Sequence, residues 1–162
     1  MFCLGILWNS MFEFKDEVFE DISKYGEIKK TYFLDLGNDY EQFVRDIYSK
    51  DTIAEWKVNK KIETMFACTE SRIVTVVILK LDPGEIEYHP LKKRNIFRNI
   101  EDMKINIREK YRNYENVYFF DNLFHATDDE KEFKDDLDVI KKYLQIINEK
   151  KFSKKRLIKR DD

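Results

Sequence analysis

The fold is decided by the stretch Asp121-Asn122-Leu123-Phe124-His125-Ala126-Thr127-Asp128-Asp129-Glu130. It joins a short apolar segment, residues 116–120, to the most regular helical pattern in the chain. Thr127 and Glu130 have the spacing of a capping box, in which the hydroxyl accepts a first-turn amide and the carboxylate reaches back. The helix that follows is predicted to bury one apolar face, made by Phe133, Leu137, Ile140, Leu144 and Ile147. His125 is therefore expected at the end of a strand, just ahead of a helix start whose free amides attract anions.

An acidic residue interrupts this predicted apolar face. Asp136 lies between Phe133 and Ile140, so its carboxylate is expected to be partly buried. Because a buried charge needs a partner, and His125 comes from the turn just before the helix, we predict a hydrogen bond between the two side chains. An imidazole held in this way is a competent nucleophile toward phosphorus. The alternative is a histidine that only pairs with Asp128 at the start of the helix.

The composition is that of a soluble globular protein with one domain. The chain has 162 residues, of which 43% are hydrophobic and 38% are charged, and its formal net charge is -2. This net charge gives no overall attraction to nucleic acid or to a membrane, so neither is expected as a partner. Cys3 and Cys68 form no paired motif and are expected to be reduced, in a cytoplasmic protein. The apolar opening, residues 1–8, is too short to cross a bilayer and is predicted to be a strand.

Strands and helices are predicted to alternate along the chain. The predicted strands are residues 2–8, 28–36, 73–81 and 116–120. The predicted helices are residues 11–25, 40–48, 52–66, 91–112 and 130–147. Two split β-α-β units in this order make a ferredoxin-like α/β sandwich, an antiparallel four-stranded sheet with helices packed on one face. The alternative is a flavodoxin-like parallel sheet, which needs a fifth strand, and the only candidate for it is residues 85–88.

A single domain is predicted to cover residues 1–148. The segment after it, residues 149–162, carries seven Lys or Arg and shows no clear apolar period. It is expected to be a flexible basic tail. The alternative is a tail, residues 150–160, that contacts RNA or acidic lipid.

The stretch around His125 resembles the active site of the nucleoside diphosphate kinases. Asn122-x-x-His125-Ala126-Thr127-Asp128 corresponds to N-x-x-H-G-S-D in that family, and Asp136 stands eleven residues after His125, where the family has Glu. Ile107-Arg108 matches an I-R pair that lies at the nucleotide phosphates. The resemblance implies a phosphotransferase that moves a phosphoryl group from a nucleotide through a phosphohistidine to an acceptor, with Asp136 orienting His125. It also implies Mg²⁺ carried with a nucleoside triphosphate, and it leaves a homo-oligomer open.

The chain also departs from that family. The Lys-Pro-Asp that ends the family's first strand is replaced by Trp8-Asn9-Ser10, and Ala126 stands in place of the Gly after the nucleophile. These departures leave open a second interpretation, a non-catalytic regulatory module on the same fold that binds a nucleotide or a protein. RNA binding across the sheet is a third interpretation, but it needs exposed aromatic residues on a central strand, and residues 73–81 contain none.

Arginines form a second predicted constellation. If residues 91–112 are one helix, then Arg94, Arg98, Arg108 and Arg112 lie along one face of it. Guanidinium groups hold phosphates through paired hydrogen bonds, so Arg94, Arg98 and Arg108 are predicted to bind the phosphates of the nucleotide. The alternative is a solvated basic face that pairs with neighbouring acids, namely Glu101, Asp102 and Glu109.

Two further residues of the opening stretch are predicted to take part. Asn122 and Thr127 can donate hydrogen bonds to phosphate oxygens. The two histidines, His89 and His125, are far apart in the sequence, and there is no cysteine pair, so no metal ligands are predicted in the protein. Mg²⁺ bound through substrate phosphates would leave little trace in a sequence.

Overall fold

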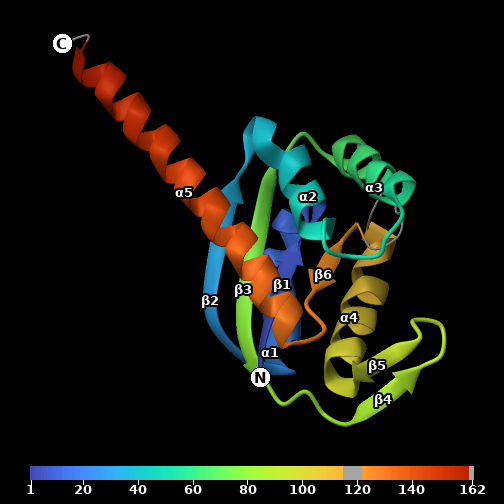
Figure 1. The fold of residues 1–162 in the computed structure, drawn as a ribbon. Coiled ribbons are helices and arrows are strands. Elements are labelled where there is room, and N and C mark those ends of the chain that lie inside the picture. Colours follow the sequence, from blue (N-terminus) through green and yellow to red (C-terminus); the bar gives the residue numbers. More distant parts are fainter. Residues whose placement is uncertain (115–121, 161–162) are drawn as a thin grey trace.

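The computed structural model describes residues 1–114 and 122–160, with side chains as far as Arg156. Within these residues the protein is α+β, with a four-stranded antiparallel sheet, a separate two-stranded hairpin and five α-helices (Figure 1). The strands are β1 (Phe2–Leu7), β2 (Gly26–Asp35), β3 (Ile73–Leu81), β4 (Ile86–His89), β5 (Arg94–Phe97) and β6 (Phe124–Ala126). The helices are α1 (Lys15–Ser23), α2 (Tyr40–Tyr48), α3 (Glu55–Cys68), α4 (Arg98–Tyr111) and α5 (Glu130–Arg160). Short 3-10 helices are η1 (Asn9–Phe14), η2 (Gly37–Asp39) and η3 (Arg112–Tyr114).

The four-stranded sheet has the order β2-β3-β1-β6, and every neighbouring pair is antiparallel. This arrangement is compatible with a ferredoxin-like sandwich and excludes the flavodoxin-like alternative, whose neighbouring strands are parallel. The candidate fifth strand at residues 85–88 corresponds to β4. It pairs with β5 in the hairpin and lies outside the four-stranded sheet.

Helices cover both faces of the sheet, whereas the sequence predicted helices on one face. Leu4, Ile6 and Trp8 belong to a buried cluster with α2, α3 and α5. Cys3 and Leu7 belong to a second cluster with α1 and α4. The reason is that β1 and β3 are apolar on both sides, and such strands are stable only when both of their faces are covered. Figure 1 shows α5 crossing one face of the sheet.

The fourth described strand of the sheet is β6, which follows the predicted strand in the sequence. Residues 116–120 lie outside the described part of the chain, and the strand that pairs with β1 is β6. Its register places His125 opposite Ile6. His125 therefore lies in the middle of a three-residue strand, not at a strand end.

The predicted helix over residues 91–112 begins only at Arg98. The residues before it complete the hairpin, because the chain turns at Lys93, whose φ is 54°, and Arg94 then begins β5. Antiparallel pairing between β4 and β5 stabilises this part as strand, and helical spacing within one segment cannot reveal such pairing. Arg94 therefore does not share a helix face with the other arginines.

The N-terminus of α5 is capped by Asp129, and the predicted cap at Thr127 is wrong. The Asp129 carboxylate accepts the backbone N–H of Glu132 at 2.8 Å, and the Glu132 carboxylate accepts the N–H of Asp128. Thr127 instead bonds to β1, where its Oγ1 accepts the N–H of Leu4 at 2.9 Å and its own N–H donates to the Leu4 carbonyl at 3.0 Å. Thr127 thus ties the segment before α5 to the sheet.

α5 continues to Arg160, well past the predicted end of the domain at residue 148. The described part of the predicted tail is therefore helical. Lys, Arg and Glu are good helix formers, and here they extend a helix that is already stabilised by packing on the sheet. No helix in the described ranges is long and apolar enough to cross a membrane.

Thr127→Val should lower the free energy of unfolding by about 1–3 kcal/mol, because the buried N–H of Leu4 then loses its side-chain acceptor. Urea unfolding followed by circular dichroism measures this change. Thr127→Ser keeps the hydroxyl and serves as the control, with a smaller loss of roughly 1 kcal/mol from the missing methyl group. Equal stability of Thr127→Val and the wild type would show that this bond adds nothing to the fold.

Candidate active site

His125 and Asp136 are in direct contact, as the sequence predicted. His125 comes from the edge strand β6, and Asp136 is buried in the second turn of α5. The distance from His125 Nε2 to Asp136 Oδ2 is 2.8 Å. The side chains keep only 15% and 10% of their surface exposed, so their hydrogen bond is largely screened from water.

This contact indicates which nitrogen of the imidazole ring carries the proton. An ionised carboxylate can only accept a hydrogen bond, so Nε2 carries the proton in its bond to Asp136. In the neutral ring, Nδ1 then holds the lone pair. Among the described residues no group hydrogen-bonds Nδ1 of His125. Nδ1 is therefore the atom of His125 that can attack an electrophile.

Aromatic rings pack against the histidine. The ring centroids of Tyr48 and His125 are 5.6 Å apart in an edge-to-face arrangement, and those of Trp8 and His125 are 6.4 Å apart. Trp8 is fully buried, and its indole N–H has no hydrogen-bond partner within the described residues. An aromatic ring without charge therefore packs beside His125 at the end of β1.

A cation that the motifs do not point to, Lys61 of α3, lies close to this group. Its side chain is almost fully buried, and its Nζ is 5.3 Å from the centre of the Tyr48 ring. The ring of Tyr48 thus lies close to both Lys61 and His125. The sequence does contain a signal for Lys61, because it stands three residues after Val58 and four before Met65, inside the apolar face of its helix.

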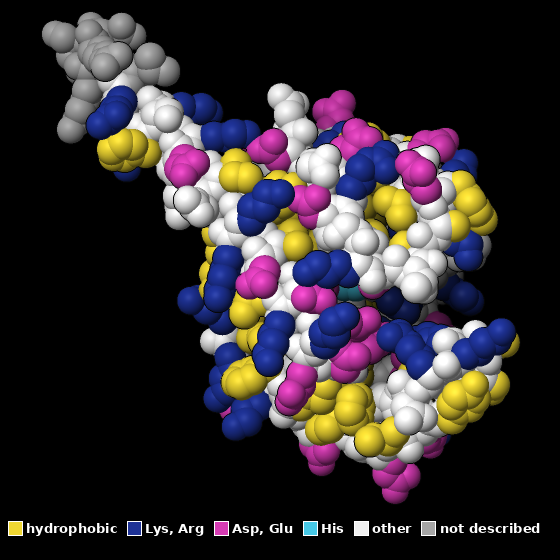
Figure 2. Space-filling model, viewed as in Figure 1, with side chains coloured by type: hydrophobic (Ala, Val, Ile, Leu, Met, Phe, Trp, Pro, Cys, Tyr) yellow, Lys and Arg dark blue, Asp and Glu magenta, His cyan; other side chains and the backbone are white. Residues whose placement is uncertain are grey.

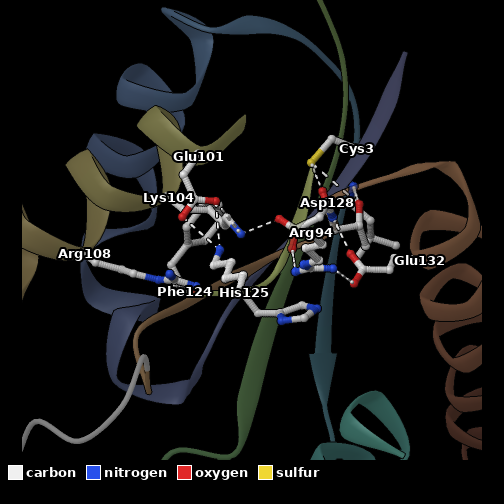
Figure 3. A network of polar contacts seen from close by, with 12 residues as sticks. Cys3, Arg94, Glu101, Lys104, Arg108, Phe124, His125, Asp128 and Glu132 are labelled. Carbon is white, nitrogen blue, oxygen red and sulfur yellow. Dashed lines mark hydrogen bonds and ion pairs between the residues drawn. The ribbon is translucent and has the colours of Figure 1, made fainter. Parts of the chain in front are cut away.

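An ion-pair cluster joins the β4–β5 hairpin, α4 and the loop that follows His125 (Figure 3). Its members are Lys92, Glu101, Lys104, Asp128, Arg94 and Glu132. Asp128 is its centre, since one carboxylate oxygen binds Lys104 and the other binds Arg94. Burial alone would raise the pKa of Asp128, but the positive charges of Lys104 and Arg94 outweigh burial and hold the pKa below its ordinary value. The cluster therefore fixes the loop after His125 to the hairpin and to α4.

The predicted row of phosphate-binding arginines is divided in the structure. Arg94 belongs to the ion-pair cluster and reaches the loop after His125. Arg98 is 49% exposed and pairs with acids of β4 and α4, which agrees with the alternative of a solvated basic face. Arg108 lies on α4, and its Nε donates to the carbonyl of Phe124 at 3.1 Å. Arg94 and Arg108 thus reach the segment that carries His125, and Arg98 does not belong to this group.

Asn122 and Thr127 are directed into the protein. Each keeps only 1% of its surface exposed. Nδ2 of Asn122 donates to the hydroxyl of Thr64 at 3.3 Å, and the hydroxyl of Thr127 accepts from Leu4 of β1. Because their polar groups are engaged within the fold, the geometry does not support their predicted role as phosphate donors.

A shallow hollow of about 210 Å³ lies beside Tyr48, in the connection between α2 and α3. Asp51 lines it, and although Asp51 as a whole is exposed, the protein atoms around its carboxyl raise its pKa. A positive charge on His125 would oppose this rise, and the charge of Asp136 adds to it. Pockets for drug-sized ligands have volumes of about 300–1,000 Å³. The hollow is therefore smaller than a typical ligand pocket, and His125 is not among the residues that line it.

Asp128→Asn should cost roughly 3 kcal/mol of unfolding free energy at neutral pH, because Lys104 and Arg94 then lose a buried counter-charge. Since the folded-state pKa of Asp128 is lowered, its contribution is complete above the unfolded pKa of about 4 and is lost as the pH falls through the folded value. The stability difference between wild type and variant should therefore shrink below about pH 4. Asp138→Asn, at an exposed position of α5, is the matched control and should show no such trend. A difference that stays constant down to about pH 2 would contradict the assigned ion pairs.

Neither a family model nor a curated protein sequence matches this chain. The resemblance to the nucleoside diphosphate kinases therefore rests on the residues around His125 and on the order of the elements.

Proposed function

We propose that the protein is a phosphotransferase that moves a phosphoryl group from a nucleoside triphosphate to His125 and from there to an acceptor. The observation that carries this proposal is the 2.8 Å hydrogen bond between Nε2 of His125 and Asp136. It leaves the lone pair on Nδ1, in a ring held in one orientation. The resemblance of the surrounding residues to the nucleoside diphosphate kinases supports the same reaction.

The reaction has two balanced steps. In the first, Nδ1 of His125 attacks the terminal phosphorus of the nucleotide, a P–N bond forms, the bond from phosphorus to the bridging oxygen breaks, and a nucleoside diphosphate leaves. The ring becomes positively charged, and Asp136 stabilises this charge through the proton on Nε2. In the second step an acceptor oxygen attacks the phosphorus and releases its proton, if it carries one, to water. The P–N bond breaks, and His125 returns to its neutral form.

Mg²⁺ is the expected cofactor, carried on the phosphates of the nucleotide. An ion in that position neutralises part of the phosphate charge. The described residues contain no group of three or more His, Cys, Asp or Glu side chains that could hold an ion by themselves. We therefore propose that the substrate supplies most of the ligands of the ion.

Two cations are proposed to receive the phosphates. Lys61 is buried beside the ring of Tyr48, and we assign to it the charge that the family's first-strand lysine supplies. Arg94 reaches the loop that follows His125, where it pairs with Asp128 and Glu132. It can hold a phosphate only when one of these two carboxylates is displaced. Arg108 has a supporting role, because its bond to the carbonyl of Phe124 positions β6.

One observation favours a second function. Trp8, whose ring is fully buried, corresponds by the sequence resemblance to the phosphate-binding lysine of the nucleoside diphosphate kinases. A chain without that cation could keep the fold and bind a nucleotide or a protein without transferring phosphate. A non-catalytic regulatory module is therefore the alternative.

Incubation with a nucleoside triphosphate and Mg²⁺ should label the wild type through an acid-labile, base-stable bond to His125. His125→Ala should abolish the label, because Nδ1 is the attacking atom. His89→Ala changes the other histidine of the chain and should keep the label. Asp136→Asn should slow labelling without abolishing it, since the carboxylate orients the ring but forms no bond to phosphorus. Intact mass spectrometry at neutral pH measures the added phosphoryl group, and nucleotide binding without any label would support the regulatory module instead.

Lys61→Met should reduce the initial rate of labelling roughly 10- to 100-fold, which corresponds to the loss of one hydrogen bond to a charged group. Lys60→Met, at the neighbouring exposed position of α3, is the matched control and should label at the wild-type rate. Circular dichroism of both variants separates a loss of activity from a loss of fold. Equal rates in the two variants would remove Lys61 from the proposed site.

A further inference from the structure

The last part of α5, residues 148–160, extends away from the rest of the protein (Figure 1). Every residue from Asn148 to Arg156 is exposed. Lys150 forms an ion pair with Asp39 of η2, which is the last such contact with the body among the described side chains. At 1.5 Å per residue the projecting part is about 20 Å long. We call this part the basic end of α5, and the part of the protein before residue 148 the body.

The face of α5 that packs on the sheet is apolar along the body and basic beyond it. Ile140, Tyr143 and Ile147 pack into the cluster on the sheet. The same helical steps of three or four residues lead on to Lys150 and Lys154. Lysines thus replace apolar residues on that face, which makes it suited to a negatively charged partner and not to an apolar one.

The charges of the chain are strongly segregated. Residues 149–162 hold seven Lys or Arg and three acidic residues, a net charge of +4, and since the whole chain carries -2, residues 1–148 carry -6. Figure 2 shows Lys and Arg side chains gathered along the projecting helix. No acidic side chain in the described ranges forms an ion pair with Lys151, Lys154 or Lys155. The net charge of the whole chain therefore hides a local excess of cations.

The arrangement of these cations indicates the kind of partner. At 100° per residue, Lys150, Lys151, Lys154, Lys155 and Arg156 spread around roughly two thirds of the helix circumference. An interfacial membrane helix needs a separate apolar face. Beyond Ile147 the apolar residues of the sequence are Phe152, Leu157 and Ile158. At 100° per residue these three positions lie at least about 100° apart around a helix, so they make no single apolar face. The guanidinium of Arg156 lies 4.9 Å from the ring centre of Phe152. Cations on most sides of a helix suit a partner that presents negative charge on more than one side.

We propose that the basic end of α5 binds double-stranded DNA along its major groove, without preference for sequence. The groove is about 12 Å wide, admits an α-helix and has phosphates along both walls. Lysines four residues apart are separated by about 6 Å along the helix, close to the rise of about 6.8 Å that separates every second phosphate of a strand. Residues 150–156 include no Asn or Gln to read adenine edges, and their one arginine, Arg156, packs its guanidinium against the ring of Phe152. This inference does not depend on the proposed phosphotransferase activity.

The test compares two triple variants of the full chain that have equal net charge. One carries Lys151→Glu, Lys154→Glu and Lys155→Glu in the basic end of α5. The other carries Lys30→Glu, Lys60→Glu and Lys93→Glu at exposed positions of the body. Fluorescence anisotropy with a 20-base-pair duplex of arbitrary sequence measures affinity as a function of salt, and a second sequence tests for preference. Circular dichroism of both variants checks that the fold is unchanged, and Glu suits the helical positions of the basic end of α5 as well as Lys does.

The wild type and the body variant should bind the duplex with equal affinity at low salt. With about five phosphate contacts, the slope of log K against log salt should be about -4.5, a loss of roughly 500-fold between about 50 and 200 mM salt. The variant in the basic end of α5 should lose at least about 30-fold at low salt, with a slope of about -2. Absence of wild-type binding at low salt, or equal losses in both variants, would overturn the proposal. Binding to polyglutamate or to anionic lipid vesicles but not to the duplex would also overturn it.

Discussion

The pairing of β6 with β1 is the constraint on which the candidate active site depends. β6 has only three residues, and its position is fixed by the ladder with β1 and by the two bonds between Thr127 and Leu4. These contacts also determine where α5 begins. Asp136 lies two turns into α5, so its contact with His125 follows from that starting point. A shift of α5 by one residue would rotate Asp136 by about 100° and turn it away from the ring.

The parts of the fold and site that depend on local spacing were predictable from the sequence. An acid inside an apolar helix face indicated a buried carboxylate with a nearby partner, and the contact between Asp136 and His125 is present. Long apolar runs likewise indicated β1 and β3. The cap of α5 could not be decided in the same way, because Thr127 and Asp129 are both good capping residues. Only the pairing with β1, which occupies the hydroxyl of Thr127, leaves Asp129 as the cap.

Contacts between distant segments set the limit of what the sequence could predict. The spacing of Arg94 and Arg98 fits a helix, but the pairing of β4 with β5 places Arg94 in a strand. Its partners Asp128 and Glu132 come from a segment more than thirty residues away. Lys61 is the opposite case, since its place inside an apolar helix face is a local signal with the same form as that of Asp136. What the sequence could not show is the neighbour of Lys61, the ring of Tyr48 at 5.3 Å.

The positive charges of the chain are of two kinds, those paired with buried carboxylates and those exposed to solvent. The net charge of the chain distinguishes neither kind. In the body, Arg94 and Lys104 are bound to a buried carboxylate, that of Asp128. An anion that approaches Arg94 must therefore displace a carboxylate. The free energy gained from the new ion pair is then offset by the loss of the old one. Along the basic end of α5, an anion that approaches Lys154 displaces only water and counterions, because this side chain is exposed and no acid in the described ranges pairs with it. A charge of -2 averages over both groups. The positions of the acids relative to the bases decide which cations can bind a partner, and for that reason an acidic body and an exposed basic helix can belong to one chain.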